Sequence, residues 1–578
     1  QAAEPKVLRY SFRVAETGFD PAQISDRYSK AVAAGIFEAP LEFAYLARPF
    51  QMRPSTAAAM PEVSADFKTL TFKIRPGILF ADDPAFKGQK RELTAADYIY
   101  SIKRHYDPKL NSRNLYLLEN VQILGLSELR KEVLASKKPF DYDRPVEGLQ
   151  LLDRYTFRIQ LGVGDPRFIN QFADSAFLGA VAREVVEAYG DKIAAHPVGT
   201  GPFVLKSWRR SSQIVLERNT AYRERLYEAG PAADDAEGQA LLARFKGRRL
   251  PMIDRVELAI IEEAQPRWLS YLAVEHDFIE LVPEEFISQA LPAGRIAPNL
   301  AKRGMQAWQI QRPDVTLTIF NMEDPIVGGY TADRVALRRA IALALDVPRE
   351  IQIVRHGQAV QAQSIVVPHT TGHESGFKSE MGDYDPPRAR ALLDLYGYTD
   401  RDGDGWREQP DGSPLVLLRN TQSDSQYRQL DDLWHKNLAA VGLKLQLKVA
   451  QWPENLKSAR SGRFMIWGVA NSAAQPDGQN LLQRLYGPAT GTQNLSRFNY
   501  PEFDKLYDRM QGLPDGPERE SLFLQAKRIG AAYMPYKPHV HRIYTDLAQP
   551  WVIGYRRPLF WQDWWQYVDI DTDLLKRQ

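Results

Sequence analysis

The sequence contains no cysteine, and this absence removes several kinds of chemistry at once. A chain without thiols forms no disulfide, uses no thiolate nucleophile and holds neither a thiolate-bound zinc ion nor an iron–sulfur cluster. The absence does not identify the cellular compartment, because a thiol-free chain is compatible with oxidising and with reducing surroundings.

Long apolar runs and an excess of one charge are also absent. The longest apolar stretches, such as residues 340–345, are far shorter than the roughly 18 residues of a membrane-spanning helix. The 74 Lys and Arg residues are balanced by 72 Asp and Glu residues, which leaves a net charge of +2. Nucleic-acid-binding proteins usually carry a basic excess, so we expect no nucleic-acid partner.

The first residues, Gln-Ala-Ala-Glu-Pro-Lys, lack the charged and apolar segments of a signal peptide. Two interpretations follow from this start. The chain is either a cytoplasmic protein or a mature exported protein from which the signal has been removed, and composition alone does not decide between them.

Helical and strand-like patterns alternate along the 578 residues, whose length suffices for about three or four domains. Thr94 and Asp97 have the spacing of a capping box at a helix start, and another helix is expected after Thr331. Residues 429–441 have helical spacing, whereas residues 443–449 alternate as a strand does. Further strands are expected at residues 71–74, 155–161, 212–217, 256–261, 317–320 and 415–418. These patterns predict an α/β protein with mixed sheets.

Catalytic motifs are scarce in the sequence. It contains no Gly-x-Ser-x-Gly elbow, no Walker loop and no His-Glu-x-x-His. Residues 198–202, Val-Gly-Thr-Gly-Pro, precede a strand-like segment rather than a helix with a lysine, which indicates a tight turn and not a phosphate loop.

The segment from Asp400 to Asp411 leaves two interpretations open. Asp400, Asp402 and Asp404 alternate as in a calcium loop, with Asp411 at the twelfth position. Pro410, the shorter closing side chain and the strand-like segment that follows favour a solvated turn built on Asp-Gly pairs.

Histidines and tryptophans have structural interpretations by default. Two histidine pairs have suggestive spacing, His369 with His373 and His539 with His541, but ordinary surface or core roles are expected. We therefore expect neither a metal nor a cofactor. The tryptophans near the end are expected to pack in a core: Trp551, Trp561, Trp564 and Trp565. Residues 227–247, which are polar and rich in Ala and Gly, are expected to form a surface excursion.

Several segments, taken in order, resemble one known family. They are residues 61–80, residues 197–203 with Trp208, residues 338–346, residues 384–386 and residues 550–555. The set resembles the peptide- and nickel-binding family of extracellular solute-binding proteins that serve ABC importers, bacterial family 5. The resemblance implies a two-lobed periplasmic-binding-protein (Venus flytrap) fold with an extra subdomain on lobe I.

The same resemblance implies how the chain divides. Lobe I is expected to comprise residues 1–44, 170–261 and 542–578. The extra subdomain is expected at residues 45–169 and lobe II at residues 262–541.

By resemblance, the protein is expected to be a periplasmic binding protein and not an enzyme. It would capture a peptide or peptide-like ligand between its lobes by hinge closure and deliver it to an ABC permease, as a monomer without a cofactor. Within the same class, the alternative ligands are an opine-like conjugate, an oligosaccharide, nickel and haem. A chaperone-like binder of unfolded segments is a further and weaker alternative. The alternative from another class is a metal-assisted hydrolase that uses Asp402, Asp404 and histidines.

The resemblance also implies ligand-binding positions. They are Arg27, Tyr28, Ser29, Tyr116, Asn321, Asn420, Ser423 and Trp467. Core packing is an equal alternative for Tyr28, Tyr116 and Trp467, as a surface charge is for Arg27. Turn or capping roles are the stronger alternative for the two asparagines and Ser423.

One departure from the family concerns the ligand's amino terminus. Peptide binders of this family place an Asp shortly after a tryptophan-containing strand, where it pairs with the α-ammonium. Here that position falls on Ala470 or Asn471, and Asp477 comes later and substitutes only if the loop folds back. An ammonium without a carboxylate loses a charge-assisted bond. The sequence therefore predicts a blocked, modified or non-peptide ligand.

Overall fold

The computed structural model describes residues 4–577, which form two compact units. Unit 1 extends to Pro283, resumes at Ile296–Trp308 and contains the chain from Asp546 onward, while unit 2 comprises Glu284–Arg295 and Gln309–Thr545. The division into lobes and a subdomain that the resemblance implies stays a prediction.

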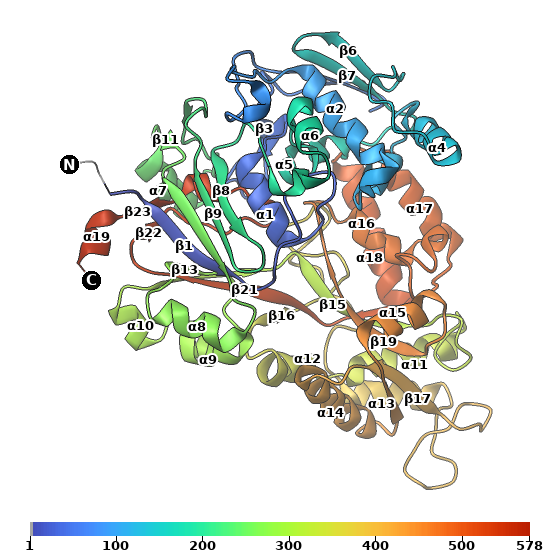
Figure 1. Ribbon diagram of the computed structural model, residues 1–578. Coiled ribbons are helices and arrows are strands. Elements are labelled where there is room, and N and C mark those ends of the chain that lie inside the picture. The colour runs from blue at the N-terminus through green and yellow to red at the C-terminus, as the bar shows by residue number, and fades with distance from the viewer. Residues whose placement is uncertain (1–3, 578) are drawn as a thin grey trace. The chain divides into compact units, whose positions relative to one another are not determined.

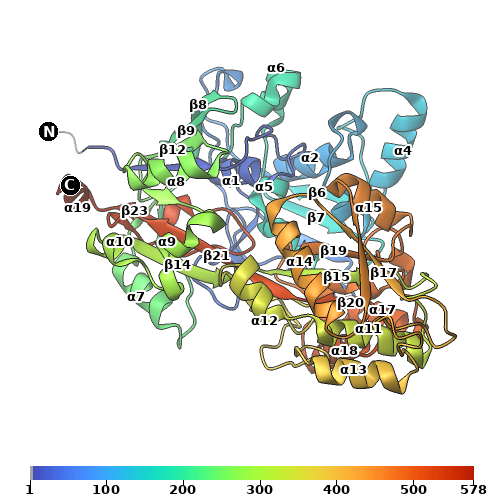
Figure 2. The ribbon, with the colours of Figure 1, turned by 90° about the horizontal axis from the view of Figure 1, so that it is seen from below.

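The main sheet of unit 1 is built around its first strand, β1 (Val7–Phe12). β1 runs parallel to β12 (Arg255–Ile260) and β13 (Phe278–Ile279). β9 (Gln213–Arg218) and β8 (Phe203–Arg209) extend the sheet in antiparallel fashion. The N-terminal strand thus lies among strands from the middle of the chain (Figures 1 and 2).

Helix α1 (Arg27–Ile36) contributes its apolar face to the core of this sheet. The Gly-Thr-Gly turn before β8 packs against the end of this helix, where a Cβ on Gly199 or Gly201 would lie 2.1 or 2.6 Å from the carbonyl oxygen of Ile36. Only glycine allows this approach. The expected tight turn is confirmed, because a strand and not a helix follows it.

A second sheet of unit 1 has its own core. β5 (Thr69–Lys73), β7 (Thr156–Gln160) and β6 (Leu149–Asp153) are antiparallel, with the short β4 (Glu62–Val63) at one edge. Helix α2 (Ala95–Tyr106) packs on this sheet and begins with the predicted capping box. Helix α4 (Leu126–Ser136) follows it in the chain.

The C-terminal tryptophans pack into unit 1, as predicted. Trp551, Trp564 and Trp565 are buried, and the indole nitrogen of Trp565 donates to the hydroxyl of Tyr10 at 2.9 Å. The half-buried Trp561 stacks on Phe43. The short strands β22 (Val552–Ile553) and β23 (Asp569–Ile570) pair beside them. The expected excursion at residues 227–247 contains helix α7 (Ala236–Phe245), which Asp235 caps.

The sheet of unit 2 is also mixed. β18 (Lys444–Val449), β17 (Val416–Thr421) and β19 (Ile466–Ser472) are parallel, whereas β15 (Asp314–Phe320) runs antiparallel to both of its neighbours, β19 and β20 (Tyr536–Pro538). Mixed sheets with helices in both units confirm the predicted α/β class. The helices around the unit 2 sheet are α11 (Ala332–Ala344), α13 (Pro386–Leu395), α14 (Ser425–Ala439), α15 (Trp452–Arg460), α17 (Pro501–Gly512) and α18 (Pro517–Tyr533) (Figure 2).

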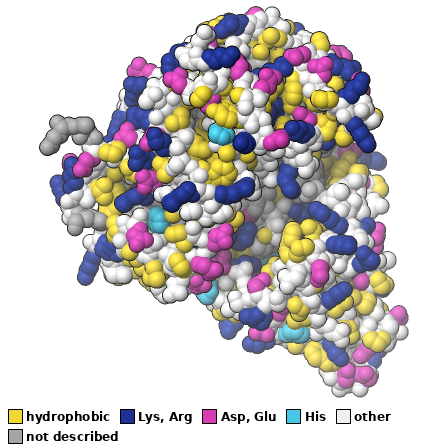
Figure 3. Space-filling model, in the orientation of Figure 1, with side chains coloured by type: hydrophobic (Ala, Val, Ile, Leu, Met, Phe, Trp, Pro, Cys, Tyr) yellow, Lys and Arg dark blue, Asp and Glu magenta, His cyan; other side chains and the backbone are white. Residues whose placement is uncertain are grey.

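Two strands carry the chain from one unit to the other. They are β14 (Gln306–Gln311) and β21 (Val540–Ala548), which are neighbours in one sheet. Between residues 4 and 577, none of the helices has the length and apolar character of a membrane span. On the face that Figure 3 shows, basic and acidic side chains are interspersed, as the balanced charge leads us to expect.

Candidate functional site

Strand β19 has one edge that is largely without a strand partner. Along its full length it pairs with β15, from Ile466 opposite Phe320 to Ser472 opposite Asp314. On its other side the pairing with β17 is confined to Ile466 and Arg419. Within residues 4–577, the segment 468–472 therefore has no pairing with another strand on that side. An edge of this kind can accept an extended chain through main-chain hydrogen bonds.

Ala470 and Asn471 lie in this free segment. Ala470 is exposed and Asn471 is half-buried, opposite Thr316 and Val315 of β15. Neither side chain carries a charge. The structure therefore places both residues on an accessible edge, at which an approaching ammonium group would find no carboxylate from either position.

Trp467 begins this segment but is a core residue. Its side chain is 1% exposed and belongs to the apolar cluster that contains Val315 and Leu317. Its ring centre lies 6.5 Å from that of the half-exposed Trp452 on α15. The indole nitrogen has no hydrogen-bond partner in the described part of the chain. Of the two alternatives for Trp467, its placement fits core packing.

Asn420, the residue after Arg419 in β17, is also buried. Its amide nitrogen donates to the side-chain oxygen of Asn455 on α15 at 3.1 Å, while its own side-chain oxygen lacks a partner among residues 4–577. Because Arg419 pairs with Ile466, Asn420 and Trp467 are the next residues along neighbouring parallel strands. An unpartnered donor on β19 and an unpartnered acceptor on β17 thus occur at neighbouring positions of the two strands.

Asn321 and Ser423 have structural roles. The amide nitrogen of Asn321 donates to the carbonyl oxygens of Gly462 and Phe464 at 3.0 and 2.8 Å, which ties β15 to the loop before β19. Ser423 is exposed and lies beside Asp424, the residue that caps helix α14. These placements match the turn and capping alternatives.

The carboxylate of Asp477 is not free to bind a ligand at β19, because it is paired within unit 2. Both of its oxygens accept from the guanidinium of Arg519, at 2.8 and 2.9 Å, and one also accepts from the backbone nitrogen of Gln479. The Arg519 side chain is fully buried, which makes this pair a structural element of unit 2. Asp477 is therefore already neutralised within its own unit.

In unit 1, Tyr28 and Ser29 of α1 face the core. The ring of Tyr28 lies 4.6 Å from that of Phe12, and burial raises the pKa of its hydroxyl to about 12. Ser29 accepts a hydrogen bond from the backbone nitrogen of Thr17 at 2.9 Å. Tyr116, in helix α3 (Leu115–Glu119), is 57% exposed.

Arg27 belongs to a charged network that sequence reasoning missed. It forms an ion pair with Glu280, which also accepts from Arg557 at 2.9 Å, and Arg557 pairs with Asp546 at 2.6 Å. Burial opposes ionisation of Glu280, but Arg27 and then Arg557 outweigh it and lower the pKa of this carboxyl. The partners are 253 and 277 residues apart, so no local pattern could reveal the network.

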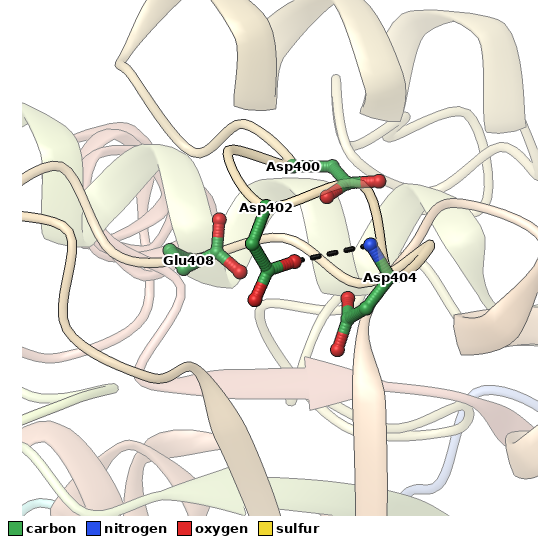
Figure 4. A group of neighbouring side chains, drawn as sticks. All are labelled: Asp400, Asp402, Asp404 and Glu408. Carbon is green, nitrogen blue, oxygen red and sulfur yellow. Dashed lines mark hydrogen bonds between the residues drawn. The ribbon is translucent and has the colours of Figure 1, made fainter.

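The acidic segment forms turns of its own (Figure 4). Asp400, Asp402, Asp404 and Glu408 bring carboxylate oxygens within 4.8 Å of one another. Asp402 accepts from the backbone nitrogen of Asp404 at 3.0 Å, and Asp400 accepts from those of Gly403 and Gly405. Asp411 lies in a separate turn, where it accepts from Ser413. The cluster contains no histidine, so it does not combine Asp402 and Asp404 with histidines as the hydrolase alternative expects.

Comparison with known proteins assigns the chain to a family. Residues 51–493 match the model of the bacterial extracellular solute-binding proteins, family 5. The chain belongs to this family. It is 25% identical to di/tripeptide-binding protein 2 of Pseudomonas aeruginosa, over 96% of this chain and 93% of that protein, and 24% identical to heme-binding protein A of Haemophilus influenzae, over 97% and 92%.

Solved structures with similar folds confirm the predicted fold class. The structure of HbpA2 from Haemophilus parasuis matches 98% of this chain and all of that one, with a TM-score of 0.75 at 19% identity. The expected two-lobed periplasmic-binding-protein fold is thereby confirmed. Family members bind solutes rather than transform them, which agrees with the scarcity of catalytic motifs.

Proposed function

We propose that this family 5 protein is the periplasmic binding component of an ABC importer and that it carries a peptide or peptide-like solute to the permease. The observation that carries the proposal is the free edge of β19. An extended peptide can add to this edge with main-chain hydrogen bonds that do not depend on its side chains. The di/tripeptide-binding relative supports the same class of ligand.

The proposed mechanism is closure around the solute. A ligand that contacts both lobes stabilises the closed state by its extra contacts, and the permease recognises that state. Strands β14 and β21, which pass between the two units, are the proposed hinge segments. The protein acts as a monomer and without catalysis, and the lobe boundaries expected from the resemblance belong to the same proposal.

The amino end of the proposed ligand is not held by a carboxylate on β19. Ala470 and Asn471 are uncharged, and Asp477 is paired with Arg519. A desolvated ammonium at this edge would lose a charge-assisted hydrogen bond. We therefore propose a blocked or modified peptide, or an opine-like conjugate, in preference to a free dipeptide.

A second candidate is a haem-like or metal-bearing ligand. The observation that favours it is the relative named heme-binding protein A, which is nearly as similar as the di/tripeptide-binding relative. Such a ligand would not need the main-chain hydrogen bonds of the β19 edge, and this difference separates the two candidates.

Native mass spectrometry of protein purified without denaturation tests the proposal. We expect one small molecule per chain, whose fragments contain amide-linked amino acids with a blocked or substituted amino end. A haem mass with visible-light absorption would favour the second candidate. Steady product formation from added peptides would contradict a protein that only binds.

A further inference from the structure

A basic turn joins helix α7 to a short strand at the margin of unit 1 (Figure 1). Residues 244–249 have the sequence Arg-Phe-Lys-Gly-Arg-Arg, in which four of six side chains are cationic. Phe245 ends α7, and Arg249 begins β11 (Arg249–Leu250). The proposed capture of a solute uses none of these residues.

The basic turn is fixed to the core of unit 1. Phe245 is fully buried, and its ring centre lies 5.5 Å from that of Tyr227. The backbone nitrogen of Tyr227 donates to the carbonyl oxygen of Arg248 at 2.7 Å. The guanidinium carbons of Arg244 and Arg248 each lie 5.4 Å from the ring centre of Phe245. The cations are therefore carried by an anchored backbone.

Three of the four cations have no partner within the protein. Arg244, Lys246 and Arg249 are exposed, and in the described part of the chain their charged groups form neither a hydrogen bond nor an ion pair. A cation at the end of a helix interacts favourably with the helix dipole, which accounts for Arg244. It does not account for Arg249, which lies on a strand.

The remaining charges do not neutralise the turn. Arg248 shares the carboxylate of Asp569 with Lys6, each at 2.7 Å, so two cations are paired with one anion. Glu224 and Glu228 are exposed near the other strand, and neither forms an ion pair within residues 4–577. The cations of this surface thus outnumber its carboxylates.

An exposed apolar side chain lies beside the cations. β10 (Arg225–Leu226) pairs with β11, and Leu226 is directly opposite Arg249. Residues in opposite positions of two paired strands lie on the same face. Leu226 is 46% exposed. Cations next to an exposed apolar side chain fit the boundary of a membrane, where phosphate groups meet acyl chains. A free phosphate or a nucleic acid would gain nothing from Leu226.

We propose that the basic turn, together with Leu226, docks the protein on the surface of an anionic phospholipid membrane. Each cation near such a surface tightens binding about fivefold, so the association is weak and reversible. It weakens as the salt concentration rises. The surface uses no residue of the β19 edge, and the proposal does not depend on which solute the protein carries.

Co-sedimentation of the full chain with lipid vesicles, without added solute, tests the proposal. We expect binding to vesicles of equal parts phosphatidylcholine and phosphatidylglycerol, and none to phosphatidylcholine alone. Lys246→Gln/Arg249→Gln should weaken binding about 30-fold, and Leu226→Ser should weaken it about threefold or more. The matched control is Lys137→Gln/Lys138→Gln, at exposed lysines after α4, which removes the same charge and should bind as the unaltered protein does.

Several results would overturn the proposal. An equal loss of binding in the two double variants would show an effect of net charge alone, and equal binding to both kinds of vesicle would show that anionic lipid is not recognised. Release by sodium phosphate beyond that by sodium chloride at the same ionic strength would indicate a site for a small anion. Binding of a DNA duplex that is lost in Lys246→Gln/Arg249→Gln would identify a general polyanion surface.

Discussion

Asp477 and Arg519 form a two-point ion pair in the interior of unit 2, with Oδ2–Nη1 and Oδ1–Nη2 distances of 2.8 and 2.9 Å. The pair joins the segment after β19 to helix α18, and Gln479 adds a further bond to the same guanidinium at 2.9 Å. It explains why the one acidic residue of the segment 470–478 is not available to a ligand on the β19 edge.

Replacing Asp477 should therefore affect stability. Asp477→Asn leaves the guanidinium of Arg519 buried without its main carboxylate partner, and we expect a loss of about 3–5 kcal/mol in the free energy of unfolding. Denaturant titration measures this loss. The matched control is Asp515→Asn, because Asp515 also pairs with Arg519 but is 61% exposed, and it should cost at most about 1 kcal/mol. Unchanged stability with loss of ligand binding would show that Asp477 contacts the ligand.

Trp467→Ala should also destabilise the protein. The side chain is fully buried among apolar residues, so its removal leaves a large cavity and should cost about 3–5 kcal/mol. The control is Trp452→Ala on α15, whose ring centre lies 6.5 Å from that of Trp467; Trp452 is 44% exposed and its replacement should cost about 1 kcal/mol. A melting temperature that stays unchanged in Trp467→Ala, with weaker ligand binding, would instead identify the tryptophan as the floor of a binding pocket.

Much of the fold was predictable because its signals are local. The capping box at Thr94 and the change of period across Gly442, which has the left-handed φ of a helix end, reflect contacts within a few residues. Helix α7 was missed because its small residues give a weak amphipathic pattern, although Asp235 provides a cap. The division into units depends on contacts between distant segments, such as β1 with β12, which no local pattern contains.

Glu42 should contribute stability that disappears in acid. Burial opposes its ionisation, but Arg225 and Arg53, each bonded at 2.6 Å, lower its pKa from 4.5 to about 2. A depressed carboxyl pKa stabilises the fold above the unfolded value, and this stability is lost as the pH falls from about 4.5 to about 2. Glu42→Gln should therefore be less stable than the unaltered protein by about 3 kcal/mol at pH 7, with a smaller difference near pH 3. A difference that does not vary with pH would contradict the assignment.

Asp563 should have the opposite pH dependence in the same cluster. Burial and then the nearby Glu42 raise its pKa from 3.8 to about 7, and its polar partner is the amide nitrogen of Gln566 at 2.8 Å. A raised carboxyl pKa favours the folded state at low pH, and this advantage is lost as the pH rises through about 7. Asp563→Asn should match the unaltered protein near pH 4 and exceed its stability at pH 8. Thermal unfolding at the two pH values provides the measurement, and a variant that is less stable at pH 8 would contradict this expectation.

The candidate site was harder to predict than the fold. Sequence resemblance indicated Ala470 and Asn471, and the structure places both on an accessible strand edge. It also indicated Tyr28 and Trp467, whose burial depends on packing partners from elsewhere in the chain.

Ala470→Asp should create the carboxylate that the β19 edge lacks. A new charge-assisted bond contributes about 1.5–3 kcal/mol, which corresponds to about 10- to 100-fold tighter binding of a peptide with a free amino end. Asn471→Asp tests the neighbouring position. The same peptide with an acetylated amino end is the control and should gain nothing from either substitution.

Titration calorimetry of the ligand-free protein with matched pairs of free and acetylated di- and tripeptides tests the proposed function most directly. We expect one peptide per chain, with acetylated peptides bound at least as tightly as free ones, and a gain for free peptides alone in Ala470→Asp or Asn471→Asp. Tighter binding of free peptides by the unaltered protein, or no binding of any peptide by a protein that binds haem, would contradict the proposal.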